Sequence, residues 1–352
     1  MKEIDKYKVS VHSSIRDAIK HMDEVGMGFC VCVDDEDKVI GVITDGDFRR
    51  AVHNVIQLDE NVGKIINKDF YYVQKNYDKE EVERIFNNTI VKQVPVIGND
   101  KLLDIITEEE FLGIEKGKKR GILDNPVVIM AGGKGKRLDP FTRILPKPLI
   151  PLGNEPVIKI IMDEFYKFGM SNFYISLGDK EKMVKAYFHD HDLGYQIKYV
   201  HEGKPLGTAG ALKYLENTLG VPFFVSNCDI IIHADYGSIY EFHKEGPYDL
   251  TMVGSMQQYK IPYGVCEIGD GGVLKQIREK PEYDFLVNTG FYLLDPIVLQ
   301  YIPDNTYFDM TDLICKIQDN SLKIGVFPVS EKSWVDVGQW RDCGNTVKEL
   351  GI

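Results

Sequence analysis

The feature that most constrains the fold is an apolar segment that runs directly into glycines. The apolar run spans 127–131, and G-G-K-G-K-R-L follows at 132–138. A run of this length is typical of a buried parallel strand, and the glycines allow the backbone to approach a phosphate group closely. The loop lacks the G-x-x-x-x-G-K-[ST] pattern of a Walker A loop. It is not a dinucleotide fingerprint either, because Leu138 stands where the third glycine would be. We expect a strand that feeds a phosphate-binding loop.

The residues after this loop alternate between helical and extended patterns. Helices are expected at 156–168, 181–189 and 208–215, and strands at 173–177, 196–200 and 222–226. This order predicts an α/β sheet with crossover helices, in which ligands bind beyond the carboxyl ends of the strands. Both the glycine loop and Asp229 follow the end of an expected strand.

The chain has 352 residues, which is too long for one ordinary domain. The clearest boundary is at 115–126, which reads E-K-G-K-K-R-G-I-L-D-N-P. Glycines, a basic cluster and a closing proline are typical of a linker. We expect one unit at 1–115, a linker at 116–125 and a second unit at 126–352.

The first unit contains a weak internal repeat. Its first half is expected to form a helix at 14–25, strands at 29–33 and 39–43, and a helix from residue 45. Its second half repeats this order, with a helix at 79–87, strands at 93–97 and 102–106, and a helix from residue 107. The repeat predicts a pseudo-twofold α+β pair, with halves at about 1–57 and 58–115.

The segment G-V-I-T-D-G-D-F-R-R at 41–50 resembles the end of a CBS domain. The resemblance implies that Thr44 and Asp47 bind the ribose of an adenine or guanine nucleotide. The second copy departs from this pattern, with Thr107 and Glu110 at the matching positions. Two interpretations stay open, a nucleotide site or a module that only packs and dimerises. Because CBS pairs commonly dimerise, we expect a homo-oligomer, a dimer or larger.

The glycine loop is followed by Arg137 and by Lys147 between two prolines. Two cations close to a glycine loop suit a polyphosphate ligand. The full string A-G-G-x-G-x-R-L-x-P-x-T-x-x-x-P-K-P-L-x-P resembles the signature of the sugar-phosphate nucleotidylyltransferases. The resemblance covers nearly all of 126–352. It implies a Rossmann-like, glycosyltransferase-A-like mixed sheet with helices on both faces.

The same resemblance assigns roles to the loop residues. Arg137 and Lys147 are the expected catalytic cations. The expected nucleotide contacts in the loop are Ala131, Gly132, Gly133, Gly135 and Lys136. Lys136 departs from the threonine that many members have.

A second segment, E-G-K-P-L-G-T-A-G-A-L at 202–212, resembles the nucleotide-base loop of the family. It adds Glu202, Gly207 and Thr208 to the expected nucleotide contacts. Thr208 is also expected to cap the helix that follows it.

Two carboxylates are the expected ligands of a magnesium ion. V-S-N-C-D ends at Asp229, and W-V-D-V-G contains Asp336. The resemblance implies that these positions hold Mg²⁺, which prefers carboxylate and phosphate oxygens. The expected sugar-phosphate contacts come from three further segments and are Tyr263, Gly264, Glu279, Lys280, Asn288 and Thr289.

Composition excludes several other classes of protein. A net charge of −12 argues against a nucleic-acid partner, which requires clustered basic residues. No apolar run is long enough to span a membrane, and the N-terminus has no signal-peptide pattern, so we expect a cytoplasmic protein. The six cysteines form no C-x-x-C pair, which argues against a zinc site or a disulfide framework.

The resemblance implies an enzyme that forms an NDP-sugar and pyrophosphate from an NTP and a sugar 1-phosphate. L-G-T-A-G-A-L favours GTP with a mannose- or heptose-type phosphate. The layout resembles the glucosamine-1-phosphate guanylyltransferases of legionaminic acid synthesis, which favours an amino sugar. One alternative is a cytidylyltransferase acting on phosphocholine or another non-sugar phosphate. Another is an inactive nucleotide-sensing protein, although all four charged site residues are retained.

Overall fold

The computed structural model describes residues 4–89, 91–113, 123–178, 180–189 and 194–338. The chain forms two compact units, Met1–Lys118 and Lys119–Ile352. Most of the expected linker at 116–125 lies outside the described residues, as does Cys343, so the expected domain boundaries stay predictions. The other five cysteines are free thiols. No helix in the described ranges is long and apolar enough to cross a membrane.

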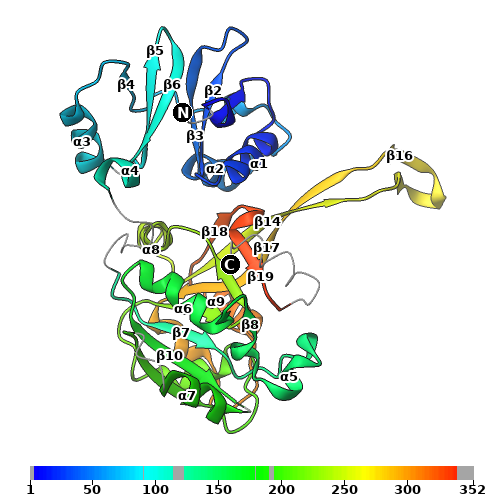
Figure 1. The fold of residues 1–352 in the computed structure, drawn as a ribbon. Helices are drawn as coiled ribbons and strands as arrows, with labels where there is room; N and C mark the ends of the chain where they lie inside the picture. The colour runs from blue at the N-terminus through cyan, green and yellow to red at the C-terminus, as the bar shows by residue number, and fades with distance from the viewer. Residues whose placement is uncertain (1–3, 90, 114–122, 179, 190–193, 339–352) are drawn as a thin grey trace. The chain divides into compact units, whose positions relative to one another are not determined.

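The first unit contains the expected repeat (Figure 1). In each half, the first strand pairs parallel with the second, and the second pairs antiparallel with the third. The first half contains β1 (Lys8–Ser10), α1 (Ile15–Val25), β2 (Phe29–Val33), β3 (Val39–Thr44) and α2 (Asp45–His53). The second contains β4 (Val73–Gln74), α3 (Lys79–Asn88), β5 (Gln93–Gly98), β6 (Lys101–Thr107) and α4 (Glu108–Leu112). The predicted helix–strand–strand–helix order is confirmed in both halves.

The second unit is organised around a seven-stranded mixed sheet with the order β11-β10-β7-β12-β17-β14-β18. β17 is antiparallel to both of its neighbours, whereas the remaining pairs are parallel. The strands are β7 (Val127–Met130), β10 (Asn172–Leu177), β11 (Gln196–His201), β12 (Phe223–Asn227), β14 (Leu250–Lys260), β17 (Glu282–Leu294) and β18 (Ile324–Val329). This mixed α/β architecture confirms the expected fold class.

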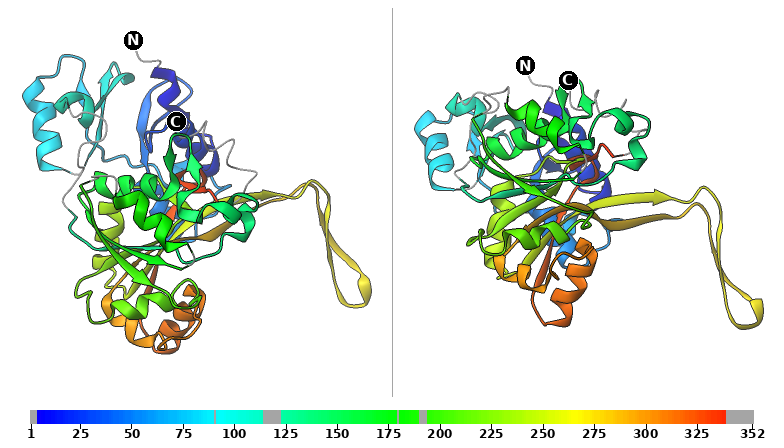
Figure 2. Two further views of the ribbon diagram at one scale, coloured as in Figure 1. Left: turned by 60° about the horizontal axis from the view of Figure 1, so that its bottom comes forward. Right: turned by 90° about the horizontal axis from the view of Figure 1, so that it is seen from below.

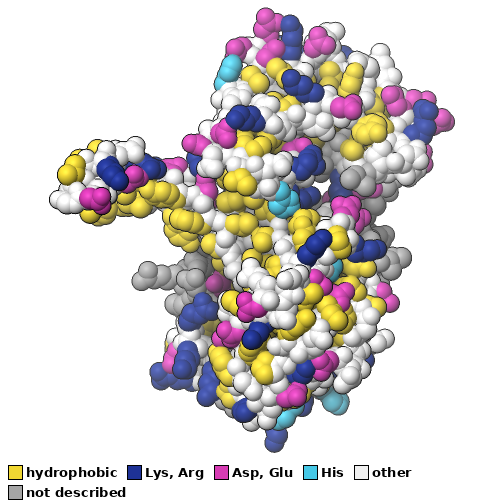
Figure 3. Space-filling model, turned by 180° about the vertical axis from the view of Figure 1, so that it is seen from behind, with side chains coloured by type: hydrophobic (Ala, Val, Ile, Leu, Met, Phe, Trp, Pro, Cys, Tyr) yellow, Lys and Arg dark blue, Asp and Glu magenta, His cyan; other side chains and the backbone are white. Residues whose placement is uncertain are grey.

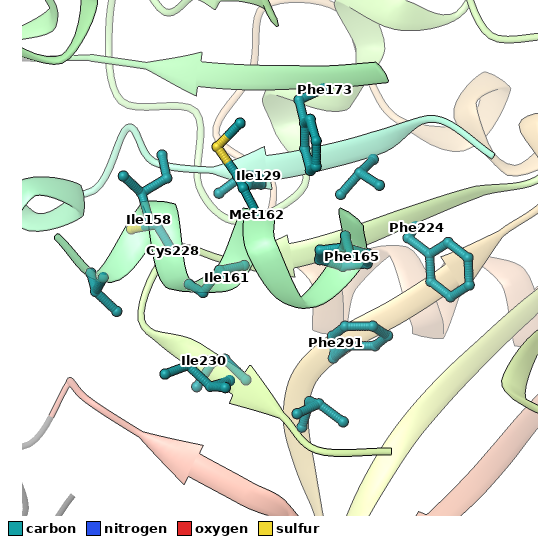
Figure 4. Close-up of a cluster of buried hydrophobic side chains, with 14 of the residues drawn as sticks. Ile129, Ile158, Ile161, Met162, Phe165, Phe173, Phe224, Cys228, Ile230 and Phe291 are labelled. Atoms are coloured by element: carbon teal, nitrogen blue, oxygen red, sulfur yellow. The ribbon is translucent and has the colours of Figure 1, made fainter. Parts of the chain in front are cut away.

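Helices pack on the sheet to form two separate cores. The larger core contains α6 (Val157–Lys167), α7 (Glu181–His189) and α8 (Tyr236–Glu245), and the other contains α9 (Met310–Asp319). Figure 4 shows the larger core, where Phe165 of α6 lies against Phe291 of β17 with ring centroids 5.4 Å apart. These close-packed cores support the sheet from whose strand ends the site loops leave.

Several short elements connect the strands and helices of this unit. Two are antiparallel pairs, β8 (Pro151–Leu152) with β9 (Glu155–Pro156) and β13 (Ile230–Ile232) with β19 (Trp334–Asp336). The others are α5 (Phe141–Ile144) and the 3₁₀ helices η3 (Lys136–Leu138), η4 (Lys147–Leu149), η5 (Gly210–Leu215), η7 (Pro296–Tyr301) and η8 (Glu331–Ser333).

The elements after residue 226 have no counterpart among the predicted ones, and they include an extended ribbon. The outer parts of β14 and β17 continue beyond the sheet into a hairpin of β15 (Val265–Ile268) and β16 (Leu274–Arg278), closed by η6 (Asp270–Gly272). Figures 1 and 2 show this ribbon, called the arm below (residues 257–287), extending away from the body of the unit. Its strands were not among the expected elements, which end at residue 226.

The prediction of an α-helix at 208–215 is wrong. The structure has the 3₁₀ helix η5 there instead, starting at Gly210. The backbone N–H groups of Ala209 and Gly210 both donate to the carbonyl of Phe308, 3.0 Å away. These long-range bonds fix the segment against the start of α9, so it does not form a regular α-helical first turn.

Candidate active site

The glycine loop leaves β7 and packs against the lysine of the P-K-P segment. Gly135 has φ of 61°, and a Cβ atom there would lie 2.7 Å from Thr142 Cγ2 and 3.1 Å from Lys147 Cβ. The Thr142 hydroxyl donates to the Gly135 carbonyl over 3.0 Å. Glycine is required here by both its backbone angle and the lack of space. The loop therefore fixes the position of Lys147.

The central contact of the site is an ion pair between Lys147 and Asp229. The Lys147 Nζ lies 2.5 Å from Asp229 Oδ2, and the two side chains are only 15% and 4% exposed. Lys147 begins η4, and Asp229 directly precedes β13. The structure thus brings together two residues that are far apart in the sequence and that sequence reasoning placed in one site.

The ammonium of Lys147 is stabilised by its surroundings. Burial lowers the pKa of Lys147, but Cys228 and Asp229 outweigh burial, so this pKa is raised above its ordinary value. Burial raises the pKa of the Cys228 thiol to about 12, so the thiol is neutral at neutral pH. Asp229 is therefore the group that holds the positive charge on Lys147 at neutral pH.

The second carboxylate, Asp336, approaches the first from β19. Ile230 pairs with Asp336 across the β13–β19 ladder, and Val337 N donates to the Asp229 carbonyl over 2.9 Å. Gly338 lies between the two carboxylates. A Cβ on Gly338 would be 2.3 Å from Asp229 Oδ2 and 2.8 Å from Asp336 Oδ1. The two carboxylate groups therefore converge on one point.

This pair of carboxylates fits a hard divalent cation. Mg²⁺ is usually bound by one or two protein carboxylates together with waters and substrate phosphates. Within the described ranges, no group of three or more His, Cys, Asp or Glu side chains could hold a metal ion. The donor set at Asp229 and Asp336 thus suits an ion that completes its coordination with substrate oxygens.

A pocket of about 160 Å³ joins the loop to this cluster. It is lined by Gly135, Lys136, Arg137, Leu138, Lys147 and Gly338. The two expected catalytic cations therefore line the same cavity, and Gly338 connects it to the two carboxylates. Such a cavity presents positive charge and loop backbone to a phosphate chain.

Glu202, which follows β11, is buried beside the first glycine of the loop. Its carboxylate accepts hydrogen bonds from the Ser176 hydroxyl and, over 3.2 Å, from Leu206 N. A Cβ on Gly132 would lie 2.2 Å from Glu202 Oε1. Gly132 is therefore needed to let this carboxylate approach the loop. Ala131, directly before Gly132, is buried and follows the last residue of β7.

Thr208 does not cap its own helix, contrary to the sequence-based expectation. Its backbone N–H donates to Asp309 Oδ1 over 2.9 Å, and its hydroxyl accepts from Met310 N over 2.8 Å. Thr208 thus binds the first turn of α9, while Gly207, with φ of 80°, turns the chain toward it. Asp309 is a positioning residue that the sequence analysis missed. Its local pattern indicates only the cap of α9, and it lies about a hundred residues after Thr208 in the sequence.

The expected sugar-phosphate residues separate into two groups. Thr289 is buried, and its hydroxyl donates to the Val253 carbonyl, while the Asn288 side chain donates to the Tyr292 hydroxyl. A Cβ on Gly290 would lie 2.4 Å from Asn227 Nδ2, so this turn lies next to the strand end that leads to Asp229.

The other group lies on the arm. Tyr263 is 74% exposed, and the Lys280 backbone N–H donates to the Tyr263 carbonyl. A Cβ on Gly264 would lie 2.9 Å from Glu279 Oε2, so all four arm residues are neighbours of one another. Figure 1 shows the arm extending away from the seven-stranded sheet. Their sugar-binding roles stay predictions.

Thr44 and Asp47 in the first unit bind each other. The Thr44 hydroxyl donates to Asp47 Oδ2 over 2.7 Å, and the two residues form a capping box at the start of α2. Arg50 pairs with the same carboxylate. In the second copy, the Thr107 hydroxyl accepts from Glu110 N over 3.3 Å. The T-x-x-[DE] pattern therefore has a structural role in both copies, and the ligand role stays a prediction.

Comparison with protein families identifies both units. A model described as nucleotidyl transferase matches residues 126–350, which is more than half of the chain. The chain belongs to the nucleotidyl transferase family. The CBS domain model matches twice in the first unit, at residues 2–54 and 62–117. The resemblances to these two families that were inferred from the sequence are thereby confirmed. Nucleotidyltransferases of this family typically use a divalent metal ion.

Curated relatives match the transferase unit of this family member. The chain is 30% identical over 241 residues to UTP–glucose-1-phosphate uridylyltransferase of Synechocystis sp., covering 63% of this chain and 62% of the relative. It is 31% identical over 235 residues to mannose-1-phosphate guanyltransferase of Yarrowia lipolytica, covering 61% of each. The chain thus spans about three fifths of the length of these relatives.

Solved structures share the fold of the transferase unit. HddC from Yersinia pseudotuberculosis superposes with a TM-score of 0.51 at 23% identity, covering 64% of this chain and 99% of that one. Its complex with GMP-PN gives a TM-score of 0.50 at 21% identity, with the same coverage.

Proposed function

We propose that the chain is a sugar-1-phosphate nucleotidylyltransferase, which joins an NTP and a sugar 1-phosphate into an NDP-sugar and releases pyrophosphate. The observation that carries this proposal is the convergence of Lys147, Asp229 and Asp336 around Gly338, which lines the glycine-loop pocket together with Lys147. Two carboxylates beside a cationic phosphate cradle suit phosphoryl transfer better than hydride, acyl or nucleic-acid chemistry.

The residues of the chain would act mainly by positioning and charge. A sugar 1-phosphate is largely dianionic near neutral pH, so its oxygen can attack the α-phosphorus without a general base. Arg137 would bind the leaving β- and γ-phosphates, and Lys147 the α-phosphate or the attacking phosphate. Their charges would stabilise the negative charge that develops on the phosphoryl oxygens.

Asp229 and Asp336 would hold the divalent cation, which we propose is Mg²⁺. When bound, the ion supplies positive charge to oxygens of both substrates. In the structure, Lys147 Nζ already lies against the same Asp229 oxygen. Lys147 is therefore placed to exchange a carboxylate partner for a phosphate partner as substrate and cation enter.

We propose GTP as the nucleotide, with a glucosamine- or mannose/heptose-type 1-phosphate as acceptor. Support comes from the guanylyltransferases among the relatives and from the buried carboxylate of Glu202. An ionised carboxylate only accepts hydrogen bonds, with about four acceptor positions, and two of those are occupied here. The remaining acceptor positions of Glu202 suit the adjacent N–H donors of guanine.

The direct test is pyrophosphate release with Mg²⁺ by the purified full chain, across four NTPs and a panel of sugar 1-phosphates. We expect one strong pairing, with GTP as the nucleotide. Turnover with CTP and phosphocholine instead would favour the cytidylyltransferase alternative. Correctly folded protein that binds nucleotide but releases no pyrophosphate from any pairing would favour the sensor alternative.

Glu202→Gln tests the choice of base. The amide replaces one acceptor by a donor, so we expect kcat/KM with GTP to fall about 10- to 100-fold, as for the loss of one or two hydrogen bonds to a charged group. The preference for GTP over UTP should shrink at the same time. Steady-state kinetics with both nucleotides measure the change, and an equal loss for both would contradict a role in base selection.

The CBS pair carries a second proposal, that a nucleotide bound near Thr44 and Asp47 regulates the transferase. The two matches to the CBS domain model support it, and Thr44 and Asp47 both stand at the start of α2. We expect AMP, ATP or the nucleotide-sugar product to change kcat or KM, and Asp47→Ala to abolish that change. Identical kinetics of the unmodified chain with and without each nucleotide would assign the pair a structural role only.

A further inference from the structure

The turn that follows β10 lies close to the chain on both sides of the glycine loop. At the start of the loop, a Cβ on Gly178 would be 2.8 Å from the Gly132 carbonyl oxygen, so the two backbones approach closely. Beyond the end of the loop, Lys180 Nζ donates to the carbonyls of Thr142 and Arg143 over 2.6 and 2.8 Å. The glycine loop therefore leaves this turn, and the chain returns to it at α5.

The short helix α5 lacks the packing that normally fixes a helix. None of its four residues is buried, and Ile144 is 76% exposed. A helix of this length is not stable by itself. Figure 3 shows Lys and Arg side chains gathered on the edge of the transferase unit below the arm, the edge where Figure 1 places α5. Bonds to the body of the unit therefore have to fix the position of α5.

The ammonium of Lys180 is suited to fixing α5. The last carbonyls of a helix have no partner within the helix and carry partial negative charge, so they favour a lysine donor. Lys180 itself has φ of 63°, in the left-handed region, which costs energy for a residue with a side chain. Such a backbone conformation persists where other contacts compensate for it. The two bonds to α5 are contacts of this kind.

The residue after Lys180 attaches the turn to the body of the unit. Glu181 begins α7, and its carboxylate lies 2.8 Å from His201 Nδ1 and 3.3 Å from Lys185 Nζ. His201 ends β11 and directly precedes Glu202, the proposed base-binding residue. The turn that holds α5 is thus tied to the strand that carries the base side of the proposed nucleotide site.

Fixing α5 also fixes the glycine loop against the proposed catalytic lysine. The Thr142 hydroxyl donates to the Gly135 carbonyl, and Gly135 packs on the Lys147 side chain. Thr142 therefore bonds to Lys180 through its carbonyl and to the loop through its hydroxyl. Without Lys180, the cations that line the pocket would have more positions available, and ordering them around a phosphate chain would cost binding affinity.

We propose that Lys180 is a positioning residue of the transferase, which holds α5, and through Thr142 the glycine loop, in the conformation that binds the triphosphate of the NTP. This role in binding rests on the proposed function. The fixing of α5 does not rest on it, so the two parts have separate measurements.

The fixing of α5 is tested on the full chain without substrate, by quench-flow hydrogen exchange and mass spectrometry. Lys180→Met should speed up exchange in residues 141–145 about tenfold, since it removes two hydrogen bonds from a charged donor. Lys180→Arg can still donate to both carbonyls and should exchange like the wild type. Lys182→Met is the matched control, because it removes an exposed ammonium two residues away, and it should also leave the exchange unchanged.

Equal exchange of residues 141–145 in the wild type and in Lys180→Met would show that other contacts hold α5, and would overturn the proposal. Exchange in the wild type at the rate of an unstructured peptide would show that α5 is not fixed, and would overturn it as well. Neither outcome depends on the reaction.

The positioning role is tested by comparing the kinetics of the two substrates. Lys180→Met should raise KM for the preferred NTP about tenfold and leave KM for the sugar 1-phosphate within about twofold, because the loop is proposed to hold the triphosphate. Lys180→Arg should restore KM. A folding defect lowers the concentration of active enzyme, and so kcat, without raising KM for one substrate. A fall in kcat alone, or an equal rise in both KM values, would overturn the positioning role.

Nucleotide binding separates a failure of this role from a failure of the proposed function. If the wild-type chain releases no pyrophosphate with any substrate pair, the proposed function fails. Calorimetry with GTP and Mg²⁺ then still compares the wild type with Lys180→Met. A Kd that is about tenfold higher in the variant would support the role of Lys180 in ordering a phosphate pocket. Equal Kd values, or no binding by the wild type, would overturn it.

Discussion

Asp229→Asn is expected to lower kcat for pyrophosphate release on the order of 10³-fold, because one substitution removes a metal-binding charge and the partner of Lys147. The Asp229 side chain is 4% exposed and lies 2.5 Å from Lys147 Nζ. Asparagine has the same shape, so the side chain still fits. Burial lowers the pKa of Lys147, and the variant lacks the negative charge that opposes this effect. The pKa of Lys147 should therefore fall.

The stability of this variant separates the chemical effect from a folding defect. Leaving a part-buried ammonium without its carboxylate should lower the free energy of unfolding by about 1–3 kcal/mol, which a domain of this size can lose and still fold. Thermal unfolding with and without Mg²⁺ and GTP measures this, and the ligands should stabilise the variant less than the wild type. Asp319→Asn, at the exposed end of α9, is the matched control and should retain full activity. Turnover within a few-fold of wild type in the Asp229 variant would refute the metal assignment.

The central body of the fold could be predicted because local signals and tertiary packing agree there. Val127–Met130 is a continuous apolar run, and it lies inside the sheet with β10 and β12 on either side. The spacing of Ile15, Ala18, Ile19 and Met22 predicts α1, and all four side chains are buried. In such segments each residue favours the same structure that the whole fold requires.

The parts that sequence reasoning missed depend on contacts between distant residues. Residues 208–215 contain good helix formers, but they form a 3₁₀ helix. The backbone N–H groups at its start donate to the distant carbonyl of Phe308. The arm has alternating apolar residues, yet no local pattern shows that its strands leave the sheet. Likewise, the motifs indicated Asp229 and Asp336 as one pair, but only the β13–β19 ladder shows how they converge. Motif order indicates which residues share a site, and tertiary pairing decides how close they lie.

Gly338→Ala is expected to lower activity about 10- to 100-fold without removing any charge from the site, because displacing a reacting group by about 1 Å can cost a hundredfold. The added Cβ would lie 2.3 Å from Asp229 Oδ2 and 2.8 Å from Asp336 Oδ1, so at least one carboxylate has to move. The atoms displaced are the ends of side chains rather than backbone. We therefore expect a small change in the thermal midpoint and a large rise in the Mg²⁺ concentration that gives half-maximal rate.

The matched control is Gly220→Ala, where an added Cβ meets nothing within 4 Å. This variant should keep the wild-type rate and the wild-type Mg²⁺ dependence. Because the Gly338 variant retains Asp229, Asp336 and Lys147, a loss of metal affinity in it can only reflect the distance between the carboxylates and not their charge. An unchanged Mg²⁺ dependence, with normal folding, would mean that the two carboxylates do not hold one ion together. The cation would then have to be held by Asp229 and the substrates alone, and Asp336 would serve to fix the Val337–Gly338 turn through its 2.7 Å bond from Gly338 N.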